Sequence, residues 1–576
     1  MTATKKSFYL VLIETSGNQQ FIFSTNRLRE NIGASELTYQ AGTKWVLEAV
    51  AEANDQTSLQ VWTDSKRLRK LLRDSEINPP IEDEKKPVEI LTAASGKALL
   101  LVKDKETAKK IISEVTRKAL FEAPGLDVAG VYEKIEDWTE KNSLAQAIKK
   151  VHKTFEKLRS RRPSPENRFL ALPIIAKCSY SDFPAFDLED LSQKQRKDGQ
   201  KPKAISLASH VKRDKANEAK NRLTNLDSRL QPQIDKLLNS DEEHQGENRA
   251  WLAIIHADGN GLGQVFLNFE DYIGEDKSNP NYIKKYREFS LSLDECTEEA
   301  FKKALDVFTQ KENQKKQNVA PIVPLIIGGD DLTVVCDGHY ALEFTRTFLK
   351  EFEQQTQDSL GIKEVAEEAF GVGRLSACAG VAIVKPHFPF SVAYHLAEQL
   401  LKSAKIVKKN VTIKQNKNAP FPCSAIDFHI LYNTTGIELN DIREKLKPEQ
   451  NIQLYNRPYI VSENLDEADG QEWIQRHQWE LLSERIKAFK SDILPRNQSH
   501  ALRNALFIGK KVADSEVKLI EQRYNLTPFI EDKDSKSLFH YSEGIYSTSF
   551  LDALEAQNFL ELDQSKNNQH KMEEIQ

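Results

Sequence analysis

Residues 322–336 read IVPLIIGGDDLTVVC, and this stretch decides the fold of the second half of the chain. Two strongly apolar runs flank the turn Gly328-Gly329-Asp330-Asp331, so the pattern predicts a tight β-hairpin. Aspartate is frequent in turns and rare in strands. Two adjacent carboxylates beside a sheet repel each other, and a nearby cation removes that cost. The hairpin therefore indicates a site for a hard cation such as Mg²⁺, which prefers oxygen ligands.

The hairpin lies inside a longer pattern of strands and helices. Before it, the sequence predicts a strand at 251–256 and a helix at 282–310. After it, helical spacing at 340–354 is followed by a strand at 376–384. This order, with a helix on each side of a central hairpin, is the βαββαβ order of a ferredoxin-like unit.

The same order of elements occurs in the first half of the chain. Its members are a strand at 8–13, a helical stretch at 19–53, a strand that precedes Ala93, a turn at Ser95-Gly96, a strand at 98–102, a helix at 105–121 and a strand at 126–132. The repeated order predicts an internal duplication.

We therefore predict an α+β protein with two ferredoxin-like palm domains that face each other. The first palm occupies residues 1–165 and the second occupies residues 249–438. Residues 166–248 form a linker or small irregular domain, and residues 439–576 form a helical C-terminal domain. A chain of 576 residues is long enough for this number of domains.

Two further stretches support this division. Residues 191–222 of the linker hold ten Lys or Arg against three Asp or Glu, which indicates either a solvated tether or a strip that contacts RNA. In the last domain, residues 473–489 and 501–512 show helical apolar spacing. The final dozen or so residues are polar and predict disorder.

Composition excludes several classes of protein. The net charge of −5 means that any nucleic-acid contact depends on local basic surface. The five cysteines are scattered without a CxxC pair, so neither a disulfide framework nor a four-thiolate zinc site is expected. No apolar run is long enough to span a membrane, and the polar N-terminus does not resemble a signal peptide. A cytoplasmic protein without a membrane partner is the expectation.

A third carboxylate, Asp258, follows the first strand of the second palm. In a βαββαβ sheet that strand lies beside the central hairpin, so Asp258, Asp330 and Asp331 are expected to converge at one edge. Three such carboxylates can hold two metal ions, Mg²⁺ or Mn²⁺, about 3.5–4 Å apart. Two metals and good alignment are most of what phosphoryl transfer requires.

Residues that can bind phosphate surround these carboxylates in the sequence. The backbone N–H groups of Gly259, Asn260 and Gly261 can wrap a phosphate chain. Gly328 and Gly329 let phosphates approach the hairpin closely.

Three further side chains are candidates at greater distance. Lys402 and Lys405, on a helix expected at 392–409, can reach the β- and γ-phosphates, although a solvated helix face explains them equally well. Ser376 can face a base or simply fill a small position in its strand.

The two copies differ at the positions that carry this chemistry. The first copy has Glu14-Thr15-Ser16-Gly17-Asn18 where the second has Asp258-Gly259-Asn260-Gly261. It has Ser95-Gly96-Lys97-Ala98 where the second has the paired aspartates. The first palm is therefore predicted to be degenerate and non-catalytic. If the palms face each other, Lys97 is a candidate contact for a second nucleotide.

These residues resemble the large subunit of type III CRISPR effector complexes, a family with two palm-type cyclase domains and a helical C-terminal domain. In the first palm the similar segments are ETSGNQQFIFSTNRLRENIG at 14–33 and ASGKALLLV at 94–102. In the second palm they are HADGNGLGQVF at 256–266, GGDD at 328–331, SACAGVAIV at 376–384 and AIDFH at 425–429. The last domain contributes LPRNQSHALRNALFIG at 494–509.

The resemblance implies an activity and its partners. The family's second palm converts ATP to cyclic oligoadenylate second messengers when the complex binds target RNA. By this resemblance, Asp258, Asp330 and Asp331 are metal ligands, and the last two are the catalytic pair. Ser376 contacts adenine, and Lys402 and Lys405 contact the triphosphate. The implied partners are the other subunits of the complex, guide RNA and target RNA.

The sequence departs from the family pattern in two places. Many members begin with an HD nuclease domain, whereas this chain starts at the first palm, so DNA cleavage is not expected. Many members also carry a zinc-binding cysteine cluster. Here Cys178 has no companion cysteines, so no zinc is expected.

Two other functions remain open from the sequence. One is a scaffold subunit with a weak palm that binds guide RNA, target RNA and partner subunits. The other is a palm cyclase that makes another cyclic nucleotide from GTP, because the GGDD turn also resembles that of diguanylate cyclases. The choice between ATP and GTP depends on a few hydrogen bonds in the base pocket, which the sequence does not define.

Overall fold

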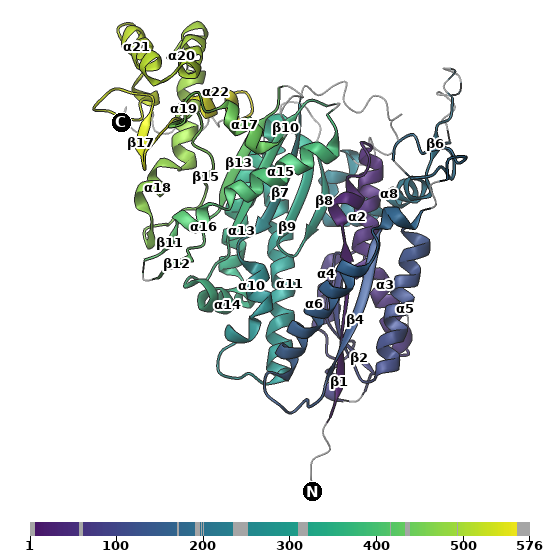
Figure 1. Cartoon of the computed structure of the whole chain (residues 1–576). Helices are drawn as coiled ribbons and strands as arrows, with labels where there is room; N and C mark the ends of the chain where they lie inside the picture. Colours follow the sequence, from purple (N-terminus) through teal and green to yellow (C-terminus); the bar gives the residue numbers. More distant parts are fainter. Residues whose placement is uncertain are drawn as a thin grey trace.

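The structure is a computed structural model of the whole chain. It describes residues 6–56, 61–83, 85–169, 172–181, 183–190, 196, 199, 201–233, 251–308, 321–386, 388–414, 416–432, 438–491 and 493–560. Figure 1 shows the first half of the chain on the right, the second palm in the centre and the C-terminal helices at the upper left.

The first sheet is antiparallel and has the order β2-β3-β1-β4. Its strands are β1 (Phe8–Ser16), β2 (Val88–Ala94), β3 (Lys97–Val102) and β4 (Asp127–Ile135). Its helices are α1 (Asn18–Ile22), α2 (Leu28–Gly42), α3 (Lys44–Ala53), α4 (Ser65–Arg73), α5 (Lys105–Glu122) and α6 (Ser143–Arg161). The order of strands and helices along the chain is the one expected from the sequence.

Helix α5 shows how the local sequence forms these elements. The Asp104 carboxylate caps its N-terminus by accepting hydrogen bonds from the backbone N–H groups of Glu106 and Thr107. Ala108, Ile111 and Val115 recur at helical spacing and are buried. The apolar face of α5 therefore packs onto the sheet while its polar face remains in solvent.

The second sheet has six strands in the order β15-β13-β10-β7-β9-β8. They are β7 (Leu252–Gly259), β8 (Ile322–Gly328), β9 (Asp331–Asp337), β10 (Ala377–Val384), β13 (Ala425–Ile430) and β15 (Tyr459–Ile460). Four of them, β8-β9-β7-β10, repeat the order and antiparallel pairing of the first sheet. Strand β13 extends the sheet in parallel to β10.

In the described part of this region, six helices accompany the sheet. They are α10 (Leu262–Leu267), α11 (Asn279–Ala304), α13 (Gly338–Asp358), α14 (Leu360–Phe370), α15 (Phe390–Ala404) and α16 (Val407–Asn410). Helix α15 lies very close to β10 because Gly380 has no side chain. A Cβ at Gly380 would lie 2.0 Å from the carbonyl oxygen of Ala397. This contact fixes the C-terminus of α15 over the sheet.

Some helix boundaries differ from the sequence prediction. The helix expected at 282–310 begins three residues earlier as α11, and residues 309–320 lie outside the described residues. The helix expected at 392–409 is divided into α15 and α16. The helix expected at 501–512 is divided at Gly509, whose φ of +135° no continuous helix accommodates.

The linker contains a long helix that the sequence analysis missed, α8 (Leu207–Leu226), beside a short hairpin of β5 (Asp187–Leu188) and β6 (Ala204–Ile205). Lys212 on this helix is buried, and its amino group donates to the carbonyl oxygen of Phe21 at 2.6 Å. Arg213 pairs with Glu30 at 2.8 Å. The basic residues at 207–222 therefore anchor a helix on the first palm, which contradicts a solvated tether there. Residues 191–195, 197–198 and 200 lie outside the described residues.

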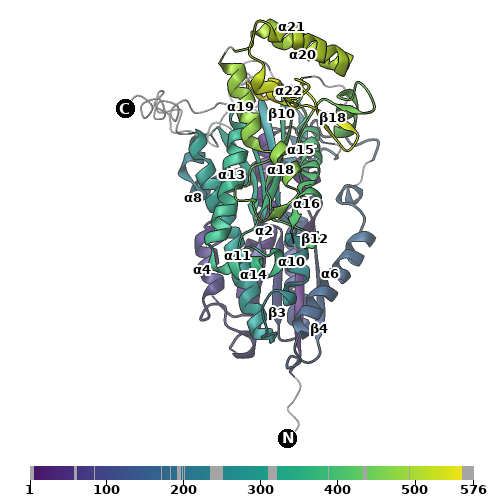
Figure 2. The same ribbon diagram turned by 90° about the vertical axis from the view of Figure 1, so that its left-hand side faces the viewer.

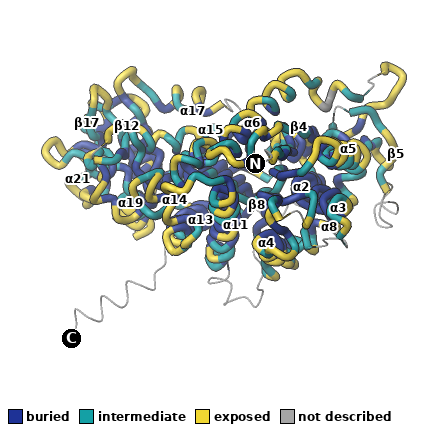
Figure 3. Tube along the Cα trace, turned by 90° about the horizontal axis from the view of Figure 1, so that it is seen from below, coloured by how far each residue is buried: buried dark blue, intermediate teal, exposed yellow. Residues whose placement is uncertain are grey.

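The two palms pack directly against each other and share one hydrophobic core. Helices α2 and α4 and strand β2 of the first palm contact α11 and β8 of the second. Figure 3 shows the contact between α2 and β8 in the buried interior. The two hairpin turns meet at this interface, because a Cβ at Gly328 would lie 3.7 Å from the Cβ of Ser95.

The C-terminal region is mainly helical, with short strands that the sequence analysis did not anticipate (Figure 2). Its helices are α17 (Leu439–Lys445), α18 (Gln471–Arg476), α19 (Trp479–Lys490), α20 (Arg496–Ile508), α21 (Lys510–Glu521) and α22 (Phe550–Ala556). The short strands here and at the palm edge are β11 (Thr412–Ile413), β12 (Asn416–Pro420), β14 (Ile452–Gln453), β16 (Ala468–Asp469), β17 (His540–Ser542) and β18 (Ile545–Ser547). Among the described residues, no helix is both long and apolar enough to cross a membrane.

Candidate metal and nucleotide site

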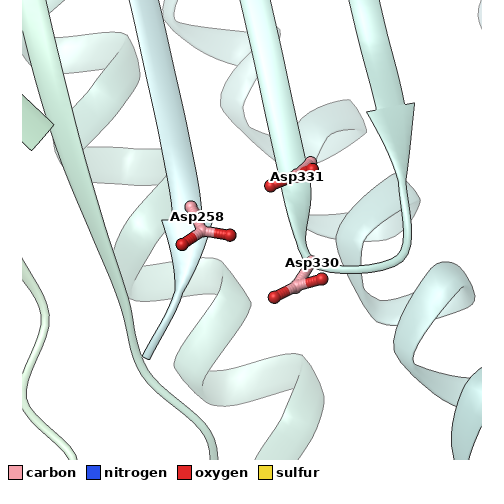
Figure 4. A group of neighbouring side chains, drawn as sticks. All are labelled: Asp258, Asp330 and Asp331. Atoms are coloured by element: carbon pink, nitrogen blue, oxygen red, sulfur yellow. The ribbon is translucent and has the colours of Figure 1, made fainter. Parts of the chain in front are cut away.

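Three aspartates meet at the edge of the second sheet. Asp258 lies near the end of β7, Asp330 lies in the hairpin turn, and Asp331 begins β9 (Figure 4). One carboxylate oxygen from each lies within 4.8 Å of the others. The structure therefore brings together the three residues that the sequence predicted as metal ligands.

Strand register explains this convergence. Strands β7 and β9 pair antiparallel, with Ala257 opposite Leu332, so Asp258 and Asp331 occupy the next position along the ladder. Strands β8 and β9 pair up to Gly328 opposite Asp331, which leaves a two-residue turn. Backbone pairing thus places Asp258 and Asp331 on neighbouring strands and Asp330 in the short turn between β8 and β9.

Gly259 permits the close approach of the hairpin. A Cβ at this position would lie 2.8 Å from both the Cβ and a carboxylate oxygen of Asp330, and 2.5 Å from Leu262. Real Cβ atoms do not approach other atoms so closely, so only glycine fits here without movement of the turn.

The pKa values of Asp330 and Asp331 are both raised. Burial, followed by the charge of Asp258, raises the pKa of Asp330 to about 6, although Lys405 and Lys97 oppose the shift. Burial and the charges of Asp330 and Asp258 raise the pKa of Asp331 well above its ordinary value. Removal from water and like charge both disfavour the ionised forms, and a bound cation relieves both.

These residues fit a site for hard divalent cations. The donor set consists of carboxylate oxygens, as Mg²⁺ and Mn²⁺ prefer.

The two candidate lysines lie in different surroundings. Lys405, at the C-terminal end of α15, forms an ion pair with Asp258. Lys402 is 67% exposed, and its amino group pairs with Glu398 at 2.7 Å. The structure thus brings Lys405 to the aspartates, whereas Lys402 forms its ion pair away from them.

Asn260 and Ser376 brace the strand ends beside the aspartates. The Asn260 side chain donates to the Ser376 hydroxyl and to the Cys423 carbonyl oxygen, each at 3.0 Å, and both Asn260 and Ser376 are buried. The backbone N–H of Asn260 donates to the Ser376 carbonyl oxygen at 2.8 Å. Gly261 has a φ of +79° and turns the chain into the short helix α10. This segment is rigid, and its backbone runs directly past the carboxylates.

Sequence reasoning missed the residues that support the hairpin from behind. Asp294 and Thr297, on α11, hydrogen-bond to the N–H and the carbonyl oxygen of Gly329. Arg69, from the first palm, donates to Asp294 at 2.6 Å. The sequence gave no sign of this contact, because it depends on how the palms pack and because α4, which carries Arg69, was not predicted.

The first palm has an ion pair where the second has two carboxylates. Glu14 pairs in register with Lys97, as Asp258 does with Asp331. The Lys97 amino group lies 3.6 Å from Glu14. Its positive charge also lowers the pKa of Asp330, so it acts on the site across the interface.

Residues 251–413 match the family model of the second palm domain of Cas10/Cmr2. This segment contains all three aspartates and Lys405. The chain therefore contains a domain similar to the second palm domain of Cas10/Cmr2. A comparison with curated proteins finds no match in sequence.

Several solved structures are similar to this chain. The type III-B Cmr-beta cryo-EM structure of the apo state is 12% identical, with a TM-score of 0.51, and the match covers 96% of this chain and 82% of that chain. A Csm1–Csm4 cassette in complex with AMPPNP is 13% identical, with a TM-score of 0.39 and coverage of 71% and 55%. Csm1 in T. onnurineus is 15% identical, with a TM-score of 0.35 and coverage of 73% and 56%. The matched part thus spans about half the length of the Csm1 chains. At these identities the likeness to the Cmr-beta chain shows a shared fold.

Proposed function

We propose that this chain is a two-metal nucleotidyltransferase that converts ATP to cyclic oligoadenylate, as the large subunit of a type III CRISPR RNA-guided complex. One observation carries the proposal. Carboxylate oxygens of Asp258, Asp330 and Asp331 meet within 4.8 Å at the edge of the second sheet, inside a domain that matches the Cas10/Cmr2 second palm. Its partners would be the other subunits, guide RNA and target RNA.

The reaction joins two nucleotides by a phosphodiester bond. The 3′- or 2′-hydroxyl of one ATP attacks the α-phosphorus of another, the hydroxyl proton is lost, and pyrophosphate leaves with the electrons of the broken P–O bond. Two Mg²⁺ or Mn²⁺ ions, when bound, lower the pKa of the attacking hydroxyl and neutralise the leaving pyrophosphate. In the last step, the terminal hydroxyl of the linear oligomer attacks the α-phosphorus of the oligomer's own 5′-triphosphate. Pyrophosphate leaves and the ring closes.

The chain's own residues hold and orient the reactants. Asp330 and Asp331 form the catalytic pair of ligands, and Asp258 completes the set. Lys405 lies beside Asp258, where its ammonium can bind the phosphates as they enter. The backbone from Gly259 to Gly261 presents N–H groups to the same phosphates.

Two residues are proposed to recognise the rest of the nucleotide. Ser376, at the start of β10, would contact the adenine, since its hydroxyl receives one hydrogen bond from Asn260 and can still donate another. Lys402, one turn before Lys405, would reach the triphosphate by releasing its exposed pair with Glu398. An exposed ion pair of this kind costs little to break, about 1 kcal/mol or less.

The test is product formation from radiolabelled ATP and, in parallel, GTP, with Mg²⁺ or Mn²⁺. Wild type is compared with the double variant Asp330→Ala/Asp331→Ala, with and without RNA and partner subunits. Metal-dependent cyclic oligoadenylate from wild type alone is the expected result. If product forms from GTP but not from ATP, the proposed site stands and the proposed substrate is wrong. A folded, ATP-binding protein that gives no product under any condition would make the chain a scaffold subunit instead.

A further inference from the structure

Hydrogen bonds hold the peptide unit of Gly329 in the hairpin turn. Gly329, the residue before Asp330, has a φ of +60°, and a Cβ placed on it would meet nothing within 4 Å. A peptide unit in such open space is free to rotate unless its polar groups are bonded. The direction of the next side chain, Asp330, follows the orientation of that peptide unit.

Helix α11 provides these bonds from one of its faces. The N–H of Gly329 donates to a carboxylate oxygen of Asp294 at 3.2 Å. The hydroxyl of Thr297, one turn further along α11, donates to the carbonyl oxygen of Gly329 at 2.5 Å. Thr297 is fully buried, so this bond has no competition from water. Both backbone polar groups of the turn residue are therefore fixed by the same helix.

Arg69 of the first palm fixes the supporting helix in turn. It lies on α4, is only 4% exposed, and donates to the free oxygen of Asp294 at 2.6 Å. Its other terminal nitrogen donates to Glu298 at 2.8 Å. The guanidinium thus orients the Asp294 carboxylate with a rigid fork. A chain of contacts runs from the first palm, through Asp294, to the residue beside Asp330.

We propose that Arg69, Asp294 and Thr297 are positioning residues that set the geometry of Asp330 and Asp331, so that the non-catalytic palm controls the catalytic turn. This inference rests on the proposed function of the site. None of the three touches the metals or the nucleotide. They act on the ligands as outer partners act in other metal sites, where their loss costs about 10–100-fold in metal affinity or activity.

The chain offers a matched control for Arg69. Arg73 lies one turn further along α4 and pairs with Glu288 of α11 at 2.9 Å, but it does not contact the hairpin network. Arg69→Met and Arg73→Met each remove two ion pairs between the same two helices. Only the first removes support from the turn. Asp294→Asn provides a second control, because it retains an acceptor for the Gly329 N–H while Asp294→Ala does not.

Three measurements on the full chain test the proposal. Hydrogen exchange of a peptide that covers 328–331 reports the turn directly, Mn²⁺ titration reports the ligands, and product formation from ATP reports catalysis. Arg69→Met, Asp294→Ala and Thr297→Val are expected to speed exchange and to weaken Mn²⁺ binding about 10–100-fold. Product formation should fall through kcat rather than KM. Asp294→Asn should lose less Mn²⁺ affinity and less activity than Asp294→Ala. Arg73→Met should behave as wild type.

Two outcomes overturn the proposal. One is unchanged exchange and unchanged Mn²⁺ affinity in folded Asp294→Ala and Thr297→Val. The other is an equal effect of Arg69→Met and Arg73→Met, which would reflect a looser palm interface and nothing specific to the turn. If wild type makes no product from ATP, the proposed function fails, yet exchange and Mn²⁺ binding still decide the role of these residues.

Discussion

The first and second palms have the same strand order and opposite electrostatics at the same position. In the first, Glu14 faces Lys97, and the two charges cancel within the protein. In the second, Asp258 faces Asp331, with Asp330 beside them, and the like charges raise the pKa of Asp331. At equivalent positions, the first sheet thus forms an ion pair and the second brings three carboxylates together.

The space between the strand end and the turn is also used differently. In the first palm Thr15 fills it, and its hydroxyl donates to the Gly96 carbonyl oxygen at 3.1 Å. In the second palm Asp330 fills it, and the strand contributes Gly259. The register makes Thr15 equivalent to Gly259, and Gly96 to Asp330. Only one side chain fits, so a carboxylate at the turn requires glycine on the strand.

The largest effect is expected when the second palm receives the charge of the first, in Asp331→Lys. The new ammonium should pair with Asp258 and displace the metals. Loss of about 4 kcal/mol of transition-state stabilisation corresponds to at least about a 10³-fold fall in product formation. Mn²⁺ at about 100 Kd should stabilise wild type by about 2.7 kcal/mol and the variant hardly at all, measured as the shift in Tm. An Mn²⁺-dependent rise in Tm that survives the substitution would place the metals elsewhere.

A smaller effect is expected when the strand end of the second palm receives the side chain of the first, in Gly259→Thr. The threonine collides with Asp330 and should displace its carboxylate by about 1 Å. A displacement of that size costs about 10²-fold in rate, measured as kcat with ATP. Gly263→Thr is a nearby control, because a Cβ there meets nothing within 4 Å. Equal activity of the two variants would contradict the single-side-chain explanation.

The two lysines of α15 sharpen the comparison further, because only one contacts the aspartates. Lys405→Met removes the ammonium beside Asp258 and should raise KM for ATP about tenfold, as expected for a hydrogen bond to a charged group worth about 1.4 kcal/mol. Lys402→Met removes an exposed pair and should change KM by about twofold or less. Steady-state kinetics on both variants measures the two KM values for ATP and shows which lysine contributes more to binding. The reverse ranking would make Lys402 the main triphosphate contact.

The sequence predicted the convergence of the three aspartates because its signals are local. Residues 328–331 form a hairpin between two apolar runs, and Asp258 ends the strand that a βαββαβ order places beside it. Hydrophobic period and turn chemistry suffice for such features. The duplication was visible for the same reason, since each copy repeats the same succession of strands and helices.

The features that sequence reasoning missed depend on contacts between distant segments. The link from Arg69 to Asp294 joins residues 225 positions apart, and no local pattern marks either one. Helix α8 was missed because its basic composition is typical of solvated chain, whereas Lys212 and Arg213 satisfy buried carbonyl and carboxylate groups on the first palm. The structure was needed to show which charges face inward.

The smallest effect is expected from the lysine that distinguishes the first palm. Lys97 pairs with Glu14 and also lowers the pKa of Asp330, so it adds positive potential where a second nucleotide would enter. Lys97→Met should weaken ATP binding by about threefold at low salt, and less at high salt, because the charge acts over a distance that ions screen. Equilibrium binding of a non-hydrolysable ATP analogue at two salt concentrations measures this. Glu14→Gln, which frees the lysine from its partner, should shift affinity in the opposite direction. Identical affinity for wild type, Lys97→Met and Glu14→Gln would show that Lys97 does not contribute to the nucleotide site. The first palm would then contribute to catalysis through a structural role, by way of Arg69.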